Sequence, residues 1–153
     1  MLRNTLILFF IIAFIGNTAF SQGTKYYSYK SRQKKYFISS WGNWSKWEYD
    51  SRADRSIAFL SRGIVFSQKE NTRIFKNIRL DKINGLWRTY RGDWVQKKGV
   101  MSGTFTLDIK GYTYMDLVKG KDSASIIIWF SNNLYARIFG DGRRSAVSIE
   151  MKK

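Results

Sequence analysis

Apolar and polar residues alternate strictly over residues 104–110, where Phe105, Leu107 and Ile109 occupy every second position. A period of two places one face of a β-strand on a core and the other face in water. Residues 146–152 repeat this alternation, with apolar side chains at the odd-numbered positions. Both segments are therefore predicted to be strands with one buried face.

Further segments have the short aromatic and β-branched runs, separated by glycine and polar residues, that are typical of strands. They are residues 36–40, 55–61, 63–67, 71–83, 86–91, 112–118, 125–130 and 134–139. Residues 71–83 also fit a short helix, and a strand is favoured because the neighbouring segments are strands. The pattern predicts an all-β fold, a small antiparallel barrel or a two-sheet sandwich of roughly eight to ten short strands.

Two of these strands form the hairpin that the pattern predicts most clearly. Residues 125–130 are apolar throughout apart from Ser125, which predicts a strand buried on both faces. Asn132 and Asn133 tolerate the left-handed conformation of tight turns, so residues 134–139 are predicted to return antiparallel.

The first 21 residues have the layout of a secretory signal peptide. Arg3 precedes an apolar run over residues 6–15, and small residues follow at Ala19 and Ser21. This layout predicts cleavage before Gln22. An uncleaved membrane anchor is the alternative, but it needs about 20 apolar residues. We expect an exported protein, periplasmic or secreted, with one β domain over residues 22–153 and no transmembrane segment after cleavage.

The chain contains neither cysteine nor histidine. Serine–histidine and cysteine–histidine catalysis are thereby excluded, as are zinc sites built on either ligand. The acidic residues form no motif, so we expect no catalytic residue, no metal site and no cofactor. Asp108 and Asp116 could face each other across a turn at Gly111, as a polysaccharide hydrolase with two carboxylates would require.

Basic residues outnumber acidic ones by 27 to 11, which gives a formal net charge of +16. Such a charge predicts affinity for polyanions, either an anionic glycan, lipopolysaccharide, extracellular nucleic acid or an acidic protein. A generic solvated basic surface is the alternative reading of the same charge.

Two clusters combine aromatic rings with cations. The candidate ligand-binding residues are Lys34, Lys35, Trp41, Trp44, Lys46 and Trp47 in the first cluster and Trp87, Arg88 and Arg91 in the second. Such rings stack on sugars or bases while the cations meet anionic groups. The alternative, which is favoured, is that the rings form a core plug or lid at one end of a barrel. A spacing of three cannot place Trp41, Trp44 and Trp47 on one face of a regular strand, so the stretch is irregular or helical, or the rings serve different surfaces.

Two resemblances accompany these patterns. The stretch from Trp41 to Trp47 is similar in letters to the tryptophan ladder of thrombospondin type 1 repeats, whose tryptophans stack with arginines. That family is held together by cysteines, which this chain lacks, so homology is rejected. The run from Ala19 to Gln22, with the short strands after it, resembles small uncharacterised secreted proteins of Bacteroidota. That resemblance implies export and β structure and no particular activity.

The expected function is therefore a non-enzymatic exported module that binds an anionic partner in the cell envelope or outside the cell. An inhibitor or immunity-type protein that caps an acidic protein is the alternative. A carboxylate-based polysaccharide hydrolase is a third class.

Overall fold

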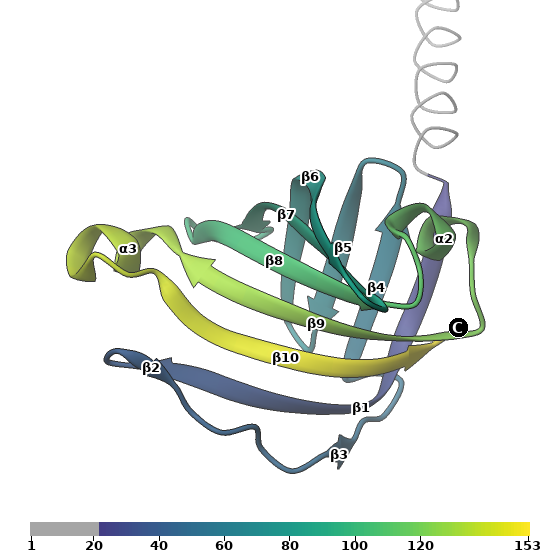
Figure 1. Cartoon of the computed structure of the whole chain (residues 1–153), viewed down its shortest axis with the longest axis horizontal. Helices are drawn as coiled ribbons and strands as arrows, with labels where there is room; N and C mark the ends of the chain where they lie inside the picture. Colours follow the sequence, from purple (N-terminus) through teal and green to yellow (C-terminus); the bar gives the residue numbers. More distant parts are fainter. Residues whose placement is uncertain (1–21) are drawn as a thin grey trace, which may run out of the picture.

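The structure is a computed structural model, and it describes residues 22–153 (Figure 1). The segment interpreted as a signal peptide, residues 1–21, lies outside the described residues. Eight antiparallel strands form a closed barrel, which confirms the all-β prediction and selects the barrel over the sandwich. They are β1 (Gly23–Phe37), β4 (Arg55–Leu60), β5 (Gly63–Gln68), β6 (Asn71–Asn84), β7 (Trp87–Gln96), β8 (Ser102–Lys110), β9 (Ser123–Asn132) and β10 (Arg143–Lys152).

Strand β1 closes the barrel because it pairs with β4 on one edge and with β10 on the other. Its pairing with β4 ends at Tyr27, and beyond that point the same edge carries β3 (Glu48–Tyr49) and then β2 (Ser40–Trp41). The chain therefore doubles back along the outside of the barrel after β1 (Figure 1).

Most of β1 is not anticipated by the sequence pattern. Its inward positions hold Tyr26, Ser28 and Ser31 instead of aliphatic residues, and a bulge between Ser28 and Lys30 shifts the alternation. The predicted strand at residues 36–40 is instead a hairpin, in which the end of β1 turns into β2.

Aromatic side chains fill the barrel. Phe75 stacks on Phe105 with ring centres 4.5 Å apart, and Phe130 and Phe66 pack against the same cluster. Such offset and edge contacts are favourable beyond the area that they bury. The inward residues expected on residues 55–61, 63–67, 104–110 and 146–152 all lie in this core.

Helix α2 (Tyr114–Lys119) covers one end of the barrel, where the sequence pattern predicts a strand at residues 112–118. Thr113 caps the helix, because its side chain accepts from Asp116 N while the Asp116 carboxylate accepts from Thr113 N. This capping box starts a helix despite the β-branched and aromatic composition. The Tyr114 hydroxyl donates to Leu60 O and Gly63 O at 2.5 and 2.8 Å, and burial raises the pKa of Tyr114.

Helix α3 (Asn133–Phe139) stands at the opposite end, so the prediction of a returning strand at residues 134–139 is wrong. The Asn132 side chain accepts from Leu134 N and Tyr135 N, and Gly140 ends the helix with a left-handed φ of 76°. These two residues are standard caps, and they override the strand-like composition between them.

Strand β9 is not buried on both faces, contrary to the prediction for residues 125–130. Ile126, Ile128 and Phe130 point into the core, whereas Ile127 and Trp129 are half-buried on the outer wall. The strand at residues 71–83 is confirmed as β6.

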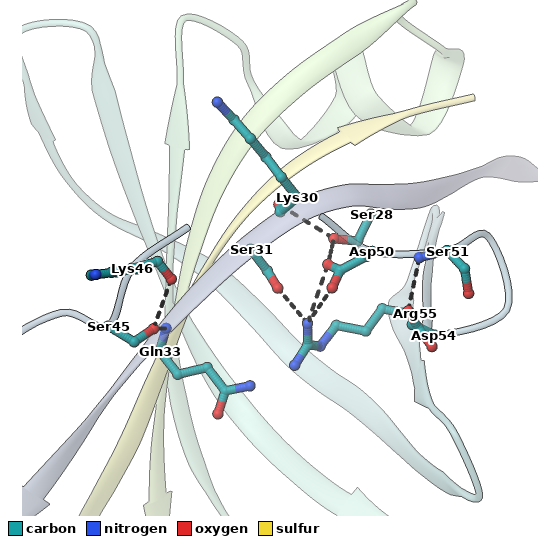
Figure 2. A network of polar contacts seen from close by, with 10 residues as sticks. All are labelled: Ser28, Lys30, Ser31, Gln33, Ser45, Lys46, Asp50, Ser51, Asp54 and Arg55. Atoms are coloured by element: carbon teal, nitrogen blue, oxygen red, sulfur yellow. Dashed lines mark hydrogen bonds and ion pairs between the residues drawn. The ribbon is translucent and has the colours of Figure 1, made fainter. Parts of the chain in front are cut away.

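A polar network occupies the position where β1 and β4 diverge (Figure 2). Arg55 donates to Ser31 Oγ at 2.5 Å and forms an ion pair with Asp50 at 3.2 Å, with both charged side chains almost fully buried. The Ser28 hydroxyl donates to the same carboxylate at 2.5 Å. The network therefore joins the loop before β4 to the strand beside it.

Candidate functional site

The tryptophan-rich stretch runs along the open edge of β1 and has no regular structure over residues 42–47. Gly42 N donates to Lys35 O at 2.9 Å, and Ser45 N donates to Gln33 O at 2.7 Å. These widely spaced bonds let the segment follow the strand with an indole at every third residue. Of the alternatives considered for this stretch, the structure has the irregular one.

Three cations stand opposite these indoles on alternate residues of β1. Lys30 Nζ lies 5.0 Å from the Trp47 ring centre. The Arg32 guanidinium lies 5.0 Å from Trp44 and 4.6 Å from Trp47. Lys34 Nζ lies 5.4 Å from Trp41 and 4.7 Å from Trp44. Cations and indoles thus interleave along the strand, in the geometry of cation–π contacts.

Trp129 of β9 completes this arrangement from the barrel wall. Its ring lies 4.6 Å from Lys34 Nζ and packs edge-on against Trp41, with centres 5.1 Å apart. Its Nε1 donates to Asp108 Oδ2 at 2.9 Å, and Asp108 Oδ1 accepts from Thr89 Oγ1 at 2.5 Å. We define the cation–indole layer as Lys30, Arg32, Lys34, Trp41, Trp44, Trp47 and Trp129.

The layer lies on the outer wall and not inside the barrel. Ala146 and Ser148 of β10, which pair with Lys34 and Arg32, are buried although they stand among outward positions. Among residues 22–153 the core cluster includes Trp94 and none of the layer's indoles. The rings therefore cover the wall and do not plug an end of the barrel.

The cations of the layer are not neutralised by carboxylates. Within the described residues the ion pairs join Arg55 to Asp50, Arg91 to Asp81 and Arg143 to Asp141. Lys30, Arg32 and Lys34 take part in none of them. The Arg32 Nε atom is buried without a hydrogen-bond partner. Three uncompensated positive charges therefore lie in one row.

A groove of about 610 Å³ adjoins the layer on the outer face of β7, β8 and β9. Trp41 and Trp129 form one side of it, and its cationic side chains are Lys82, Arg91 and Arg143. Asp108 also lines the groove, and Arg91 and Arg143 are paired with Asp81 and Asp141, so the groove adds less net positive charge than the layer.

The structure brings together only part of the predicted site. Lys34, Trp41, Trp44 and Trp47 lie in the layer, and Arg91 lines the adjoining groove, although it is paired with Asp81. Lys35 and Lys46 are exposed beside the layer, and no ring contact joins either to it among the described residues.

The second predicted cluster does not reach the layer. Trp87 opens β7 at the α2 end, next to Lys110, and Arg88 pairs in register with Ile109. Sequence reasoning also missed Lys30, Arg32 and Trp129. The alternation of cations over residues 30–34 was the available signal for the first two.

The carboxylates do not form the pair considered for hydrolysis. Asp116 belongs to the cap of α2, whereas Asp108 bonds to Trp129 and Thr89 on the outer wall. Residues 22–153 contain no group of three or more acidic side chains arranged to hold a metal ion. No helix in that range is long and apolar enough to cross a membrane.

No protein-family model, curated protein or solved structure matches this chain. Indoles do stack with cations in this structure. They do so on a closed barrel without cysteine, which is a different framework from the ladder family.

Proposed function

We propose that this protein is an exported, non-enzymatic binding module whose cation–indole layer holds an anionic glycan chain, including the phosphorylated glycan of lipopolysaccharide. The observation that carries the proposal is the row formed by Lys30, Arg32 and Lys34, which lies among four indoles and has no carboxylate partner within the described residues.

The spacing of this row suits a linear ligand. Alternate residues of a strand lie about 7 Å apart, so a chain that follows β1 meets one cation after another. A guanidinium that stacks on an indole through its face can donate from its terminal N–H groups to sulfate, phosphate or carboxylate oxygens. The indole edges and faces beside it offer apolar contacts to sugar rings.

The two partners carry opposite charges, and counterions are released when they associate. Binding should therefore weaken steeply as the salt concentration rises. The proposal is tested by chromatography of residues 22–153 on heparin and on immobilised lipopolysaccharide across a salt gradient. This segment contains every strand of the closed barrel and all of its core.

The informative variant carries Lys30→Gln, Arg32→Gln and Lys34→Gln together. Its matched control carries Lys25→Gln, Lys76→Gln and Lys119→Gln, which removes the same charge from exposed positions outside the layer. We expect the layer variant to elute at clearly lower salt than the control. Equal elution of the two variants would show that charge alone governs retention and would overturn the proposal. Recovery of one stoichiometric acidic protein, with no retention on either matrix, would favour the inhibitor class instead.

A further inference from the structure

Three segments at the α3 end of the barrel carry large apolar side chains into solvent. On the β1–β2 hairpin, Phe37 is 73% exposed and Ile38 is 86% exposed. On α3, Ile138 and Phe139 are 62% and 69% exposed, and Val100 in the β7–β8 loop is fully exposed. We call these five residues the apolar tips.

The three segments are neighbours in space. Arg143, just after α3, donates to the Tyr36 hydroxyl beside the hairpin at 2.9 Å. Asn133 of α3 donates to Ser102 Oγ, next to the β7–β8 loop, at 3.2 Å. The hairpin and α3 both reach beyond the barrel on the same side (Figure 1). The tips therefore form one end of the molecule.

Ile38 has a backbone conformation that does not suit isoleucine. Its φ is 57°, in the left-handed region that glycine and asparagine adopt with little strain and β-branched residues adopt rarely. The side chain is also almost fully exposed to water, so packing inside the described domain does not offset this strain. A residue that opposes local stability and adds no core contact indicates selection for something outside the domain.

Helix α3 points to the same conclusion. It has seven residues, none of them buried, and helices of this length are marginal in water without a packing partner. Leu134, Ile138 and Phe139 together leave it with an apolar surface that no described segment covers.

The charges around the tips have one sign. Lys97 and Lys98 lie beside Val100, and Arg137 and Arg144 are exposed on and after α3. Asp141, the carboxylate that follows α3 in the sequence, forms an ion pair with Arg143 at 2.6 Å. Exposed apolar side chains fringed by uncompensated cations are the composition of a surface that inserts shallowly into an anionic bilayer.

We propose that the apolar tips dock this protein on a phospholipid surface that carries anionic headgroups. Phe37, Ile38, Ile138 and Phe139 enter the interfacial region, while the neighbouring lysines and arginines meet the phosphates. Separate tips from three segments favour a bilayer over a complementary protein groove. The docking surface shares no residue with the cation–indole layer and does not rest on the function proposed for it.

The test is flotation of residues 22–153 with vesicles of phosphatidylcholine, with and without phosphatidylglycerol. We expect binding to the anionic vesicles that is salt-sensitive and far weaker on phosphatidylcholine alone. Ile38→Asn and Phe139→Ser should each weaken binding about tenfold, which corresponds to losing one buried apolar side chain. Lys97→Gln and Lys98→Gln should each weaken it about fivefold.

Three controls separate docking from misfolding and from charge alone. Leu86→Ser removes a side chain of matched exposure, 64%, from the β6–β7 turn at the other end of the barrel, and it should leave binding unchanged. Ile38→Asn should raise the melting temperature while it weakens binding, a combination that an unfolded variant cannot produce. The layer variant described above should float as wild type does.

Wild-type binding by both tip variants would overturn the proposal, because the charge would then suffice. Equal binding to neutral vesicles would overturn it as well. Sedimentation velocity tests for a dimer. A dimer that Ile38→Asn abolishes would show that a second copy of this chain covers the tips, and this result would also overturn the proposal.

Discussion

The Arg32 guanidinium lies 4.6 Å from the centre of the Trp47 ring, and this contact fastens an irregular outer segment to the barrel wall. Few backbone bonds join residues 42–47 to β1, so side-chain stacking determines where the segment lies. The same guanidinium belongs to the row of cations that we propose binds the ligand. Structural support and the proposed binding role therefore depend on one side chain.

Replacing Arg32 with methionine should loosen this segment while keeping an apolar stem. Two cation–π contacts disappear, and each exposed contact of this kind is worth about 0.5–1 kcal/mol. Removal of a buried Nε without a partner offsets part of that loss, so we expect destabilisation of about 1 kcal/mol. Urea unfolding measures the stability, and tryptophan emission should shift to the red. Arg79→Met, at an exposed position of β6, is the control, and an equal red shift there would contradict this reading.

Strands with regular apolar alternation could be predicted from the sequence. Strands β8 and β10 are the examples. Helix α3 could not be identified from composition, because Tyr135, Ile138 and Phe139 are residue types enriched in strands. Its caps, Asn132 and Gly140, carried the information, and the sequence pattern presents Asn132 as a turn residue. The signal for helix α2, Thr113 three residues before Asp116, was missed because residues 112–118 were assigned to a strand.

The candidate site was recoverable only in part, since it depends on pairing between distant segments. The tryptophan stretch was identified by its letters, but Trp129 joins it through the register of β9, β10 and β1. That register sets Trp129 beside Ala146, and Ala146 beside Lys34. A single sequence contains no direct signal for this neighbourhood.

The Arg55–Asp50 pair should contribute far more to stability than the exposed pairs. Both side chains are 9% exposed, so Asp50→Ala leaves a buried guanidinium without its counter-charge. Loss of one partner of a buried pair typically destabilises by about 3–5 kcal/mol. Asp81→Ala breaks the ion pair with Arg91, where the exposures are 34% and 57%, and should change stability by about 0.5 kcal/mol or less. Chemical unfolding of both variants measures the two losses of stability. Similar unfolding midpoints for the two variants would contradict this prediction.

Gly103 is required by close approach between strands β8 and β9. A Cβ at this position would lie 1.7 Å from Ser131 O and 2.6 Å from the Trp94 ring nitrogen. The same carbonyl accepts a hydrogen bond from Trp94 Nε1 at 2.9 Å, so it cannot move away without breaking that bond. We expect Gly103→Ala to destabilise the domain by about 3 kcal/mol, the upper part of the range for overpacking. Gly111→Ala, with open space around its Cβ position and a φ of 76°, tests backbone strain alone and should be milder. A larger loss for Gly111→Ala in thermal unfolding would contradict the steric argument.

Acid should remove a stabilising contribution from Asp141. Hydrogen bonds from the Arg143 side chain and backbone hold the pKa of Asp141 well below its usual value. A carboxyl whose pKa is lower in the folded state stabilises the fold above its unfolded pKa of about 3.9. That stability disappears as the pH falls from about 4 through the folded pKa. Asp141→Asn should therefore be less stable than wild type at neutral pH, and the difference in stability between the two should narrow in acid.

Asp116→Asn should behave in the same direction, because the Thr113 backbone N–H lowers the pKa of Asp116. The two sites lie in α2 and after α3, at opposite ends of the barrel, so their effects should add. Urea midpoints of wild type and variants, measured across this pH range, provide the check. A stability difference that widens in acid would contradict the prediction.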